Sequence, residues 1–324
     1  MRRTSLLLLL SGFLSGGAFA ADADDWFAQM TAKAAQQSFR GTFIYERSGI
    51  FSSHRIWHLA QGAEASRERL LQLDGQPHEV VLANGQVSCA TADLVESMAD
   101  VQQWSGRRLD VARLGKTYEL KLLGNSRVAG RSAVALLLLP RDTYRYAREL
   151  HLDSESGLPL KTLLLNEQGQ LLERLQFTSF SLSQQISEQE LQAVTDCKKV
   201  PVPEAASVVT SSWQALWMPP GFIQVGVMQR PGAVSGLPVQ SLLFDDGLAR
   251  VTVFIEPLGA ERVDNAHGQI GPTVVVSRPF KTTEGAYMAT VVGEVPLRTA
   301  ERIALSIGVK DSKSDLRGSR KPEG

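Results

Sequence analysis

Two histidines, His54 and His58, stand four residues apart, the spacing with which a helix can hold a metal ion. On a helix such residues share one face and can bind the same ion. The residues around them, 53–59, instead alternate between polar and apolar as a strand does. Four residues of strand separate two side chains by about 13 Å, which is too far for shared coordination. We therefore interpret both as strand histidines and predict no metal or cofactor.

Three further patterns resemble catalytic motifs but lack a required residue or have a simpler explanation. Residues 115–117 match the end of a phosphate-binding loop, but Asp110 stands where that motif needs glycine. His151 lies between two leucines in an alternating segment, so its side chain is expected on the polar face of a strand. The Asp-Asp-Gly sequence at 245–247 is typical of a hairpin turn. No other catalytic set is recognisable, and the sequence does not indicate an enzyme.

The first twenty residues differ from the rest of the chain and indicate export. Arg2 and Arg3 precede a short apolar run at 6–14, and an Ala-Phe-Ala sequence ends at Ala20. A positive start, a short apolar core and this cleavage pattern are typical of a secretory signal peptide. A membrane anchor would need about 20 consecutive apolar residues, about twice the length of this run. We predict cleavage after Ala20 and a soluble mature protein in an oxidising compartment.

The chain has two cysteines, Cys89 and Cys197. They form no C-x-x-C motif and have no neighbouring histidine that would complete a zinc site. In an exported protein such a pair is more often a disulfide than two free thiols. The sequence leaves both states open, because it does not show whether the two Cα atoms come within bonding reach. A bond would stabilise the fold by roughly 4 to 5 kcal/mol in the chain-entropy model.

The composition is that of a globular protein. The 324 residues are 43% hydrophobic and 21% charged, and the formal net charge is zero. This length predicts one or two domains with ample core. The charge balance argues against nucleic-acid binding, which needs an excess of lysine and arginine on one face.

The periodicity of apolar residues predicts a large β-rich module in the first half of the chain. Residues 23–37 have helical spacing, and a period of two then predicts antiparallel strands to about residue 180. A second helix is expected at 91–103. We expect strands at 42–47, 53–59, 68–73, 79–83, 118–123, 134–139, 144–152, 158–165 and 171–180, with turns at 74–75, 84–85, 124–125 and 166–169.

A second module follows a stretch in which Pro201 and Pro203 interrupt the pattern. Its expected strands are at 222–229, 239–244, 249–256, 273–277 and 287–292, with a closing helix at 296–307. The predicted organisation is a signal peptide at 1–20, a large domain at 21–197, a linker at 198–212, a small domain at 213–310 and a disordered tail at 311–324.

Ordered segments in both modules resemble the MucB/RseB family. They are residues 38–47, 56–58, 68–75, 140–146, 149–153 and 156–161 in the first module and 219–222, 246–250, 254–257, 271–273 and 291–296 in the second. The resemblance implies an α+β, β-rich fold. In such a fold the large N-terminal domain is an unclosed antiparallel β-barrel with helices, similar to lipoprotein carriers of the LolA and LolB type, and the smaller C-terminal domain is α/β.

The resemblance also implies a function. Members of the family are periplasmic negative regulators of the envelope-stress sigma factor. They bind the periplasmic domain of a membrane anti-sigma factor, MucA or RseA, and protect it from site-one proteolysis. Lipid or lipopolysaccharide fragments are expected to release the partner by favouring a conformation or an assembly, such as a homodimer, that binds it less well. Two alternatives stay open: a periplasmic lipid or lipoprotein carrier, and an undetected hydrolase. The regulon, alginate synthesis or envelope repair, is also open.

No active-site motif is transferred from the family, so the candidate binding residues are chosen by type and position. For a lipid groove they are Phe43, Trp57, Trp104, Leu136 and Leu138, apolar side chains that a curved sheet could equally bury in its core. For the partner surface they are Trp217, Phe222 and Arg230, near the start of the second module.

Overall fold

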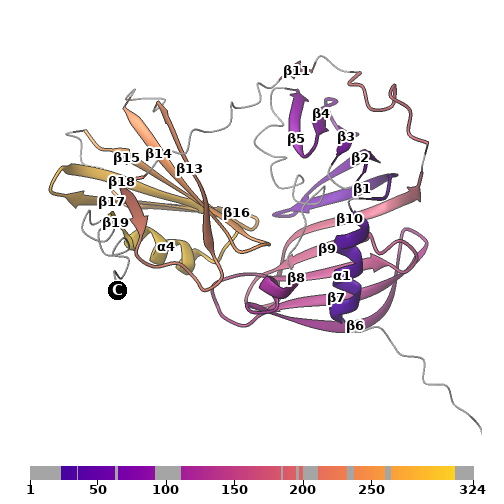
Figure 1. The fold of residues 1–324 in the computed structure, drawn as a ribbon, viewed down its shortest axis with the longest axis horizontal. Helices are drawn as coiled ribbons and strands as arrows, with labels where there is room; N and C mark the ends of the chain where they lie inside the picture. Colours follow the sequence, from indigo (N-terminus) through magenta and orange to yellow (C-terminus); the bar gives the residue numbers. More distant parts are fainter. Residues whose placement is uncertain are drawn as a thin grey trace, which may run out of the picture.

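Two large antiparallel sheets make up most of the protein, and they lie side by side along its longest axis (Figure 1). The structure, a computed structural model, describes residues 23–34, 36–62, 65–91, 111–183, 185–194, 197–199, 211–231, 237–259 and 264–310. We call the described residues up to 199 the large module and those from 211 the small module. The predicted signal peptide and tail, and most of the predicted linker and of the helix at 91–103, lie outside the described residues.

The large module is an eleven-stranded antiparallel sheet that does not close on itself. Its strands lie in the order β11-β5-β4-β3-β2-β1-β10-β9-β8-β7-β6, so β11 and β6 form its edges. This arrangement confirms the unclosed antiparallel barrel that the sequence implied. The strands are β1 (Phe39–Arg47), β2 (Ile50–Ala60), β3 (Ser66–Gln72), β4 (Glu79–Ala83), β5 (Gln86–Ala90), β6 (Tyr118–Val128), β7 (Arg131–Pro140), β8 (Ala147–Asp153), β9 (Pro159–Leu165), β10 (Leu171–Leu182) and β11 (Lys198–Lys199).

Tight turns with two consecutive residues of positive φ join several neighbouring strands. Asn84 and Gly85, between β4 and β5, have φ values of 53° and 72°. Ala129 and Gly130, between β6 and β7, have 49° and 77°. Two consecutive residues with positive φ give the hairpin turn whose twist matches that of the flanking strands.

The turn predicted at 124–125 is wrong. Strand β6 continues through Gly124, and a bulge there shifts its register against β7. Gly124 has a φ of 116°, which glycine adopts without steric cost. A Gly-Asn pair can therefore mark a bulge within a strand as well as a chain reversal.

Helix α1 (Ala23–Ala34) packs against one face of β6, β7 and β8. Phe27 and Met30 are buried there against leucines that include Leu136. The short helix α3 (Val111–Leu114) adds a fully buried leucine to the same cluster. We call the sheet face on which α1 lies the inner face.

The end of the large module is tied to its sheet. Lys198 and Lys199 of β11 lie opposite Ala90 and Cys89 of β5. Next to this pairing, Cys89 and Cys197 form a disulfide with their Cα atoms 5.6 Å apart, a separation that disulfides ordinarily span.

The small module is a six-stranded antiparallel sheet with helix α4 (Leu297–Leu305) on one face. The strand order is β13-β14-β15-β18-β17-β16, and β12 pairs with β19 in a separate two-stranded sheet. The strands are β12 (Trp213–Ala215), β13 (Ile223–Pro231), β14 (Pro238–Asp245), β15 (Arg250–Pro257), β16 (Ala266–Ile270), β17 (Thr273–Thr282), β18 (Gly285–Gly293) and β19 (Ile307–Val309).

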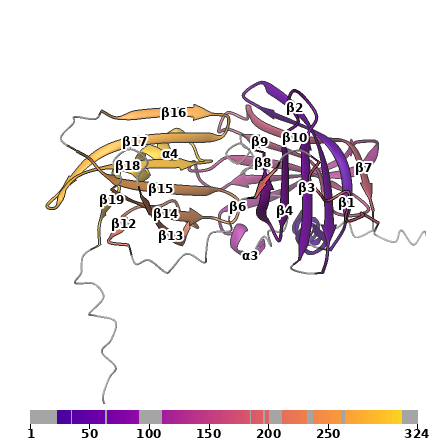
Figure 2. The ribbon, with the colours of Figure 1, turned by 90° about the horizontal axis from the view of Figure 1, so that it is seen from above.

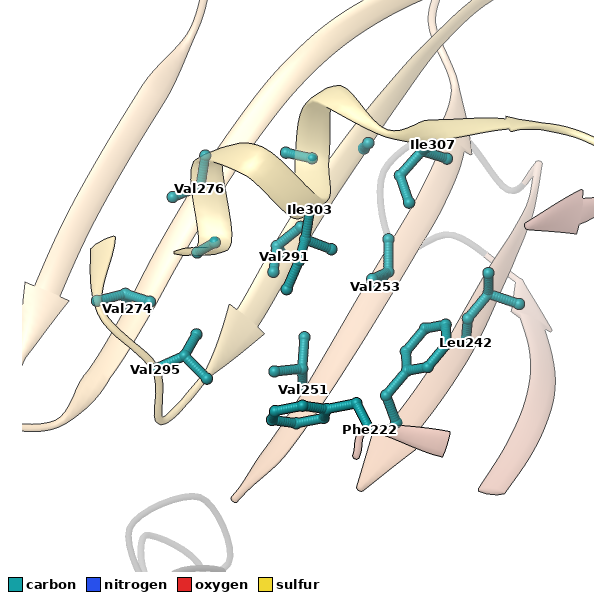
Figure 3. Packing of buried hydrophobic residues seen from close by; sticks show 14 of the residues in the cluster. Phe222, Leu242, Val251, Val253, Val274, Val276, Val291, Val295, Ile303 and Ile307 are labelled. Atoms are coloured by element: carbon teal, nitrogen blue, oxygen red, sulfur yellow. The ribbon is translucent and has the colours of Figure 1, made fainter. Parts of the chain in front are cut away.

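Alternate residues of the central strands build the core of this module. Val251, Val253 and Val291 point toward Ile303 of α4 (Figure 3), and all four are almost completely buried. Strand β16 was not predicted, because Ile270 is the one large apolar side chain in its sequence Ala-His-Gly-Gln-Ile. It forms through backbone pairing with β17.

Candidate binding faces and the junction between the modules

Three of the five groove candidates lie on the inner face of the large sheet. Residues opposite one another across a sheet point to the same side, as do residues two apart along a strand. The register connects Phe43 to Phe177 on β10 and Leu150 on β8 to Leu136 on β7. The pairing of β10, β9 and β8 joins these two sets into one face, which also includes Leu138.

These three side chains are core residues in this structure. Phe43 is 1% exposed and packs with Phe177 and Leu70, while Leu136 and Leu138 are fully buried in the cluster beneath α1. Among the described residues the inner face is therefore closed by packing at these positions. An apolar ligand would have to displace part of this packing to reach them.

The structure places Trp57 on the opposite face. It lies across from Arg40 on β1 and Arg69 on β3, with the Arg69 guanidinium 4.6 Å from its ring centroid. Ile186 and Leu191, which follow β10 in the sequence, pack against the Trp57 ring. Trp57 and Phe43 thus do not line one surface, and Trp104 lies outside the described residues.

Both strand histidines belong to an aromatic layer on the inner face. His54 stacks on Phe43 with ring centroids 5.2 Å apart, and His58 stacks on Phe39 at 4.9 Å. Burial lowers the pKa of His54 to about 4, although Asp74 acts in the opposite direction. His54 is therefore neutral near pH 7 and forms part of an apolar wall.

The two modules meet around Arg145, whose side chain is completely buried. Its Nη1 donates to Asp246 Oδ2 at 2.6 Å, and its Nη2 donates to the carbonyl of Pro220 at 2.5 Å. The guanidinium lies between the rings of Tyr118 and Phe222, 5.4 Å from each centroid. A buried charge is tolerated only with such complete pairing, so this contact fixes how the modules meet.

Asp246 is the acceptor at the centre of this contact. Its other oxygen, Oδ1, accepts the backbone N–H groups of Leu248 and Ala249 at 2.8 and 2.7 Å, which closes the hairpin turn between β14 and β15. The hydroxyl of Tyr118 donates to Oδ2 at 3.1 Å. Burial and the neighbouring carboxylate raise the pKa of Tyr118 well above its usual value, so the phenol keeps the proton that it donates.

Two of the three partner-surface candidates lie at this junction. Phe222 is buried beside Arg145. Trp217 meets the ring of Tyr144 edge to face at 5.2 Å, and the guanidinium of Arg302 lies 3.9 Å from the Trp217 centroid. Arg302 also donates to the hydroxyl of Tyr144 at 3.0 Å. The third candidate, Arg230, belongs to β13, and its side chain is not described.

Two glycines allow the modules to approach closely. A Cβ on Gly221 would lie 2.6 Å from Thr117 Cγ2, and one on Gly271 would lie 2.5 Å from Arg47 Cγ. Arg47 donates from Nη2 to the carbonyl of Ile270 at 3.1 Å. Both contacts join a turn of the small module to the large one.

Most of these contacts come from the segments whose sequences resembled a known family. Sequence reasoning chose Phe222 as a surface residue and missed Arg145 and Asp246, although the quoted segments contain both. The available signal was the concentration of charged, aromatic and glycine residues in short loops, where function is often located. The family-like segments that meet at the junction are 38–47, 140–146, 219–222, 246–250, 271–273 and 291–296.

Neither a metal centre nor a membrane helix is found in the part of the chain that the structure describes. No group of three or more histidine, cysteine, aspartate or glutamate side chains there could hold a metal ion. No described helix has the length and apolar character needed to cross a membrane.

The fold and the junction define a two-module, mostly β protein in which an open antiparallel sheet is joined to a smaller sheet with a helix. The profile of the MucB/RseB N-terminal domain matches residues 22–195, and that of the MucB/RseB C-terminal domain matches residues 207–308. The chain belongs to the MucB/RseB family.

Proteins and solved structures of this family are similar to the chain over most of its length. Sigma factor AlgU regulatory protein MucB of Pseudomonas aeruginosa is 51% identical over 95% of this chain and 98% of its own length. The complex structure of P. aeruginosa MucA/MucB matches with a TM-score of 0.80 and 49% identity over 90% of this chain and all of that one. A crystal structure of MucB matches with a TM-score of 0.68 and 46% identity over 90% of this chain and 99% of that one.

Proposed function

We propose that this protein is a periplasmic, non-enzymatic negative regulator of an envelope-stress sigma factor of the AlgU type. It binds the periplasmic domain of a MucA-type anti-sigma factor. The observation that supports this most strongly is the match, over nearly the full length of both chains, to a MucB that is seen in complex with MucA. Export through a signal peptide cleaved after Ala20 places the protein in the same compartment as that domain.

Binding protects the anti-sigma factor from a DegS-like site-one protease, because a protein that occupies the substrate segment keeps the protease from it. The test mixes the purified mature protein with the MucA periplasmic domain and the protease. We expect the cleavage rate to fall in proportion to the fraction of MucA bound. An unchanged rate at saturating concentrations would contradict the proposal.

Lipid or lipopolysaccharide releases the partner by entering the inner face of the large sheet. The packing supports a coupling between this face and the junction, since Leu248 of the small module belongs to the same buried cluster as α1 and Leu136. Leu248 lies next to the turn in which Asp246 binds Arg145. An acyl chain that separates Leu248 from Leu136 therefore also disturbs the contact that fixes the two modules.

This release has its own test. Lipopolysaccharide is titrated into the complex with MucA, and the dissociation of the labelled MucA domain is followed by fluorescence anisotropy. Leu136→Ala loosens the packing of the cluster and should lower the concentration of lipopolysaccharide needed for release. Transfer of bound lipid between two vesicle populations, without any effect on MucA, would indicate a lipid carrier instead.

A further inference from the structure

Strand β16 is an open edge of the small sheet. All five of its residues, Ala266–Ile270, are exposed, and within the described residues no strand lies beyond it. Figure 2 shows β16 along the outer margin of the sheet, with its C-terminal end beside β2. Backbone groups on its outer side are therefore available to another chain.

The hairpin between β16 and β17 determines which residues of β16 face outward. Ile270 and Thr273 are paired across the two-residue turn at 271–272, so they exchange backbone hydrogen bonds. Because such pairs alternate along an antiparallel ladder, Gly268 and Ala266 also bond to β17. The N–H and C=O groups of His267 and Gln269 consequently point away from the sheet.

The other edges of the two large sheets have features that oppose the addition of a strand, whereas β16 does not. Strand β13 has a bulge at 224–226, β6 has one at 122–124, and β11 is two residues long. Natural edge strands are usually protected by bulges, charges, proline or shortness. Strand β16 has a regular register against β17 and contains no lysine, acidic residue or proline.

Apolar side chains surround the end of β16 where it meets the large module. Ile270 is 70% exposed, and the hairpin that contacts it contains Ile50 at 74% and Phe51 at 61%. Arg47, the cross-strand partner of Ile50, donates to the carbonyl of Ile270. A strand added along β16 would thus extend toward apolar residues of both modules.

We propose that the outer edge of β16 binds an extended segment of the anti-sigma factor's periplasmic domain by strand addition. Main-chain hydrogen bonds to His267 and Gln269 supply the attachment, and apolar side chains of the segment contact Ile270 and Phe51. Edge addition of this kind takes affinity from the backbone and specificity from the side chains. The inference rests on the proposed binding of MucA.

The test removes one outward N–H without changing the pairing with β17. His267→Pro does this, because proline is tolerated on edge strands where its nitrogen faces solvent. The matched control His267→Ala removes the same side chain and keeps the N–H. Affinity for the MucA periplasmic domain is measured by isothermal titration, with the mature protein in each case. We expect His267→Pro to weaken binding by about tenfold or more and His267→Ala by less than about twofold.

A second measurement covers the case in which the proline variant does not fold. Hydrogen exchange of the wild-type protein is followed with and without MucA, and the amides of His267 and Gln269 should exchange rapidly alone and slowly in the complex. Failure of the wild-type protein to bind MucA would contradict the proposed function. Binding without slowed exchange at these amides would overturn strand addition alone. Slowed exchange that depends on the protein's own concentration would assign the edge to a second copy and would equally overturn the proposal.

Discussion

Asp246 shows how one residue can serve two parts of a structure. The sequence pattern correctly predicted a hairpin turn, and the carboxylate does accept the two backbone N–H groups that close it. The same carboxylate faces a fully buried guanidinium from the other module. Nothing in the local pattern indicates the second role, since Arg145 is 101 residues away along the chain.

Replacement of Asp246 by alanine should destabilise the protein by about 3 to 5 kcal/mol. It removes one of the two carboxylates that pair with the buried Arg145, leaving only Asp142, and it takes the acceptor from the Tyr118 hydroxyl and from the turn. The free energy of unfolding is measured by urea titration. The matched control is Glu119→Ala, which breaks the exposed pair with Lys121 and should cost less than about 1 kcal/mol. Equal effects of the two substitutions would show that the Arg145 contact does not hold the modules together.

The burial of His54 should make the free energy of unfolding depend on pH. Its pKa is about 4 in the folded protein and 6.5 in the unfolded chain, so between these values the unfolded chain binds more protons. Stability should therefore rise from pH 4 to pH 6.5, by up to about 3 kcal/mol from this residue. His54→Phe keeps an aromatic ring and cannot titrate, so its unfolding free energy should vary less over this range. An identical pH profile in the variant would assign the dependence to other groups, such as His151.

The candidate groove residues show what residue types can and cannot predict. Phe43, Leu136 and Leu138 do share one face, as apolar residues at alternate positions should. Trp57 was grouped with them by its chemistry, but the two-residue turn at 48–49 pairs it with Arg40 on the other face. That turn was visible in the sequence as Ser-Gly between two strands. Counting the register from it would have separated Trp57 from Phe43.

At the scale of elements, glycine does more than form turns. The predicted turns with Gly85 and Gly247 are present, while Gly124 lies in a bulge. Gly221 has a φ of 87° and also lies against Thr117 of the large module. Sequence patterns indicate that the backbone is unusual at such positions, but they do not show which distant segment comes close.

Gly221 and Gly169 form a matched pair for testing this close approach. Both have positive φ, 87° and 73°, but a Cβ on Gly169 would meet no atom within 4 Å. Gly169→Ala should cost about 1 kcal/mol from backbone strain alone. Gly221→Ala should cost about 1 to 3 kcal/mol more, because Thr117 and the turn must also separate. Thermal and urea unfolding of the two variants measure the difference, and equal losses would show that Thr117 yields freely.

The disulfide should stabilise the large module by closing a long loop. Cys89 and Cys197 are separated by 108 residues, for which the chain-entropy model gives roughly 4 to 5 kcal/mol. The double variant Cys89→Ser with Cys197→Ser should lower the unfolding free energy of the oxidised protein by about this amount. Reduction of the wild-type protein with dithiothreitol provides the control and should give the same loss. An unchanged urea midpoint after both treatments would contradict this prediction. It would mean that the pairing of β11 with β5 is enough to hold this end of the chain.

At the scale of the whole molecule, the sequence predicted two modules but not how they meet. Apolar periodicity indicates which residues each sheet buries, and that information is local. The junction is built from buried charges, carbonyls and glycines in turns that lie far apart in sequence, including Arg47, Arg145, Gly221 and Asp246. Such groups have no period, so only the three-dimensional structure brings them together. Family resemblance marked their segments without giving their role.

The arrangement of the modules should in turn set the affinity for the anti-sigma factor. Arg302→Ala removes the contacts with Trp217 and Tyr144 from an exposed position, so it loosens the junction without disturbing either core. If the partner binds only the joined arrangement, a loss of about 1 kcal/mol there lowers the affinity for MucA by at most roughly fivefold. Arg298→Ala, on the same helix with the same change in charge, is the control and should bind normally. Small-angle scattering should show a wider range of module orientations for Arg302→Ala alone. Wild-type affinity in a variant with separated modules would mean that MucA recognises each module independently.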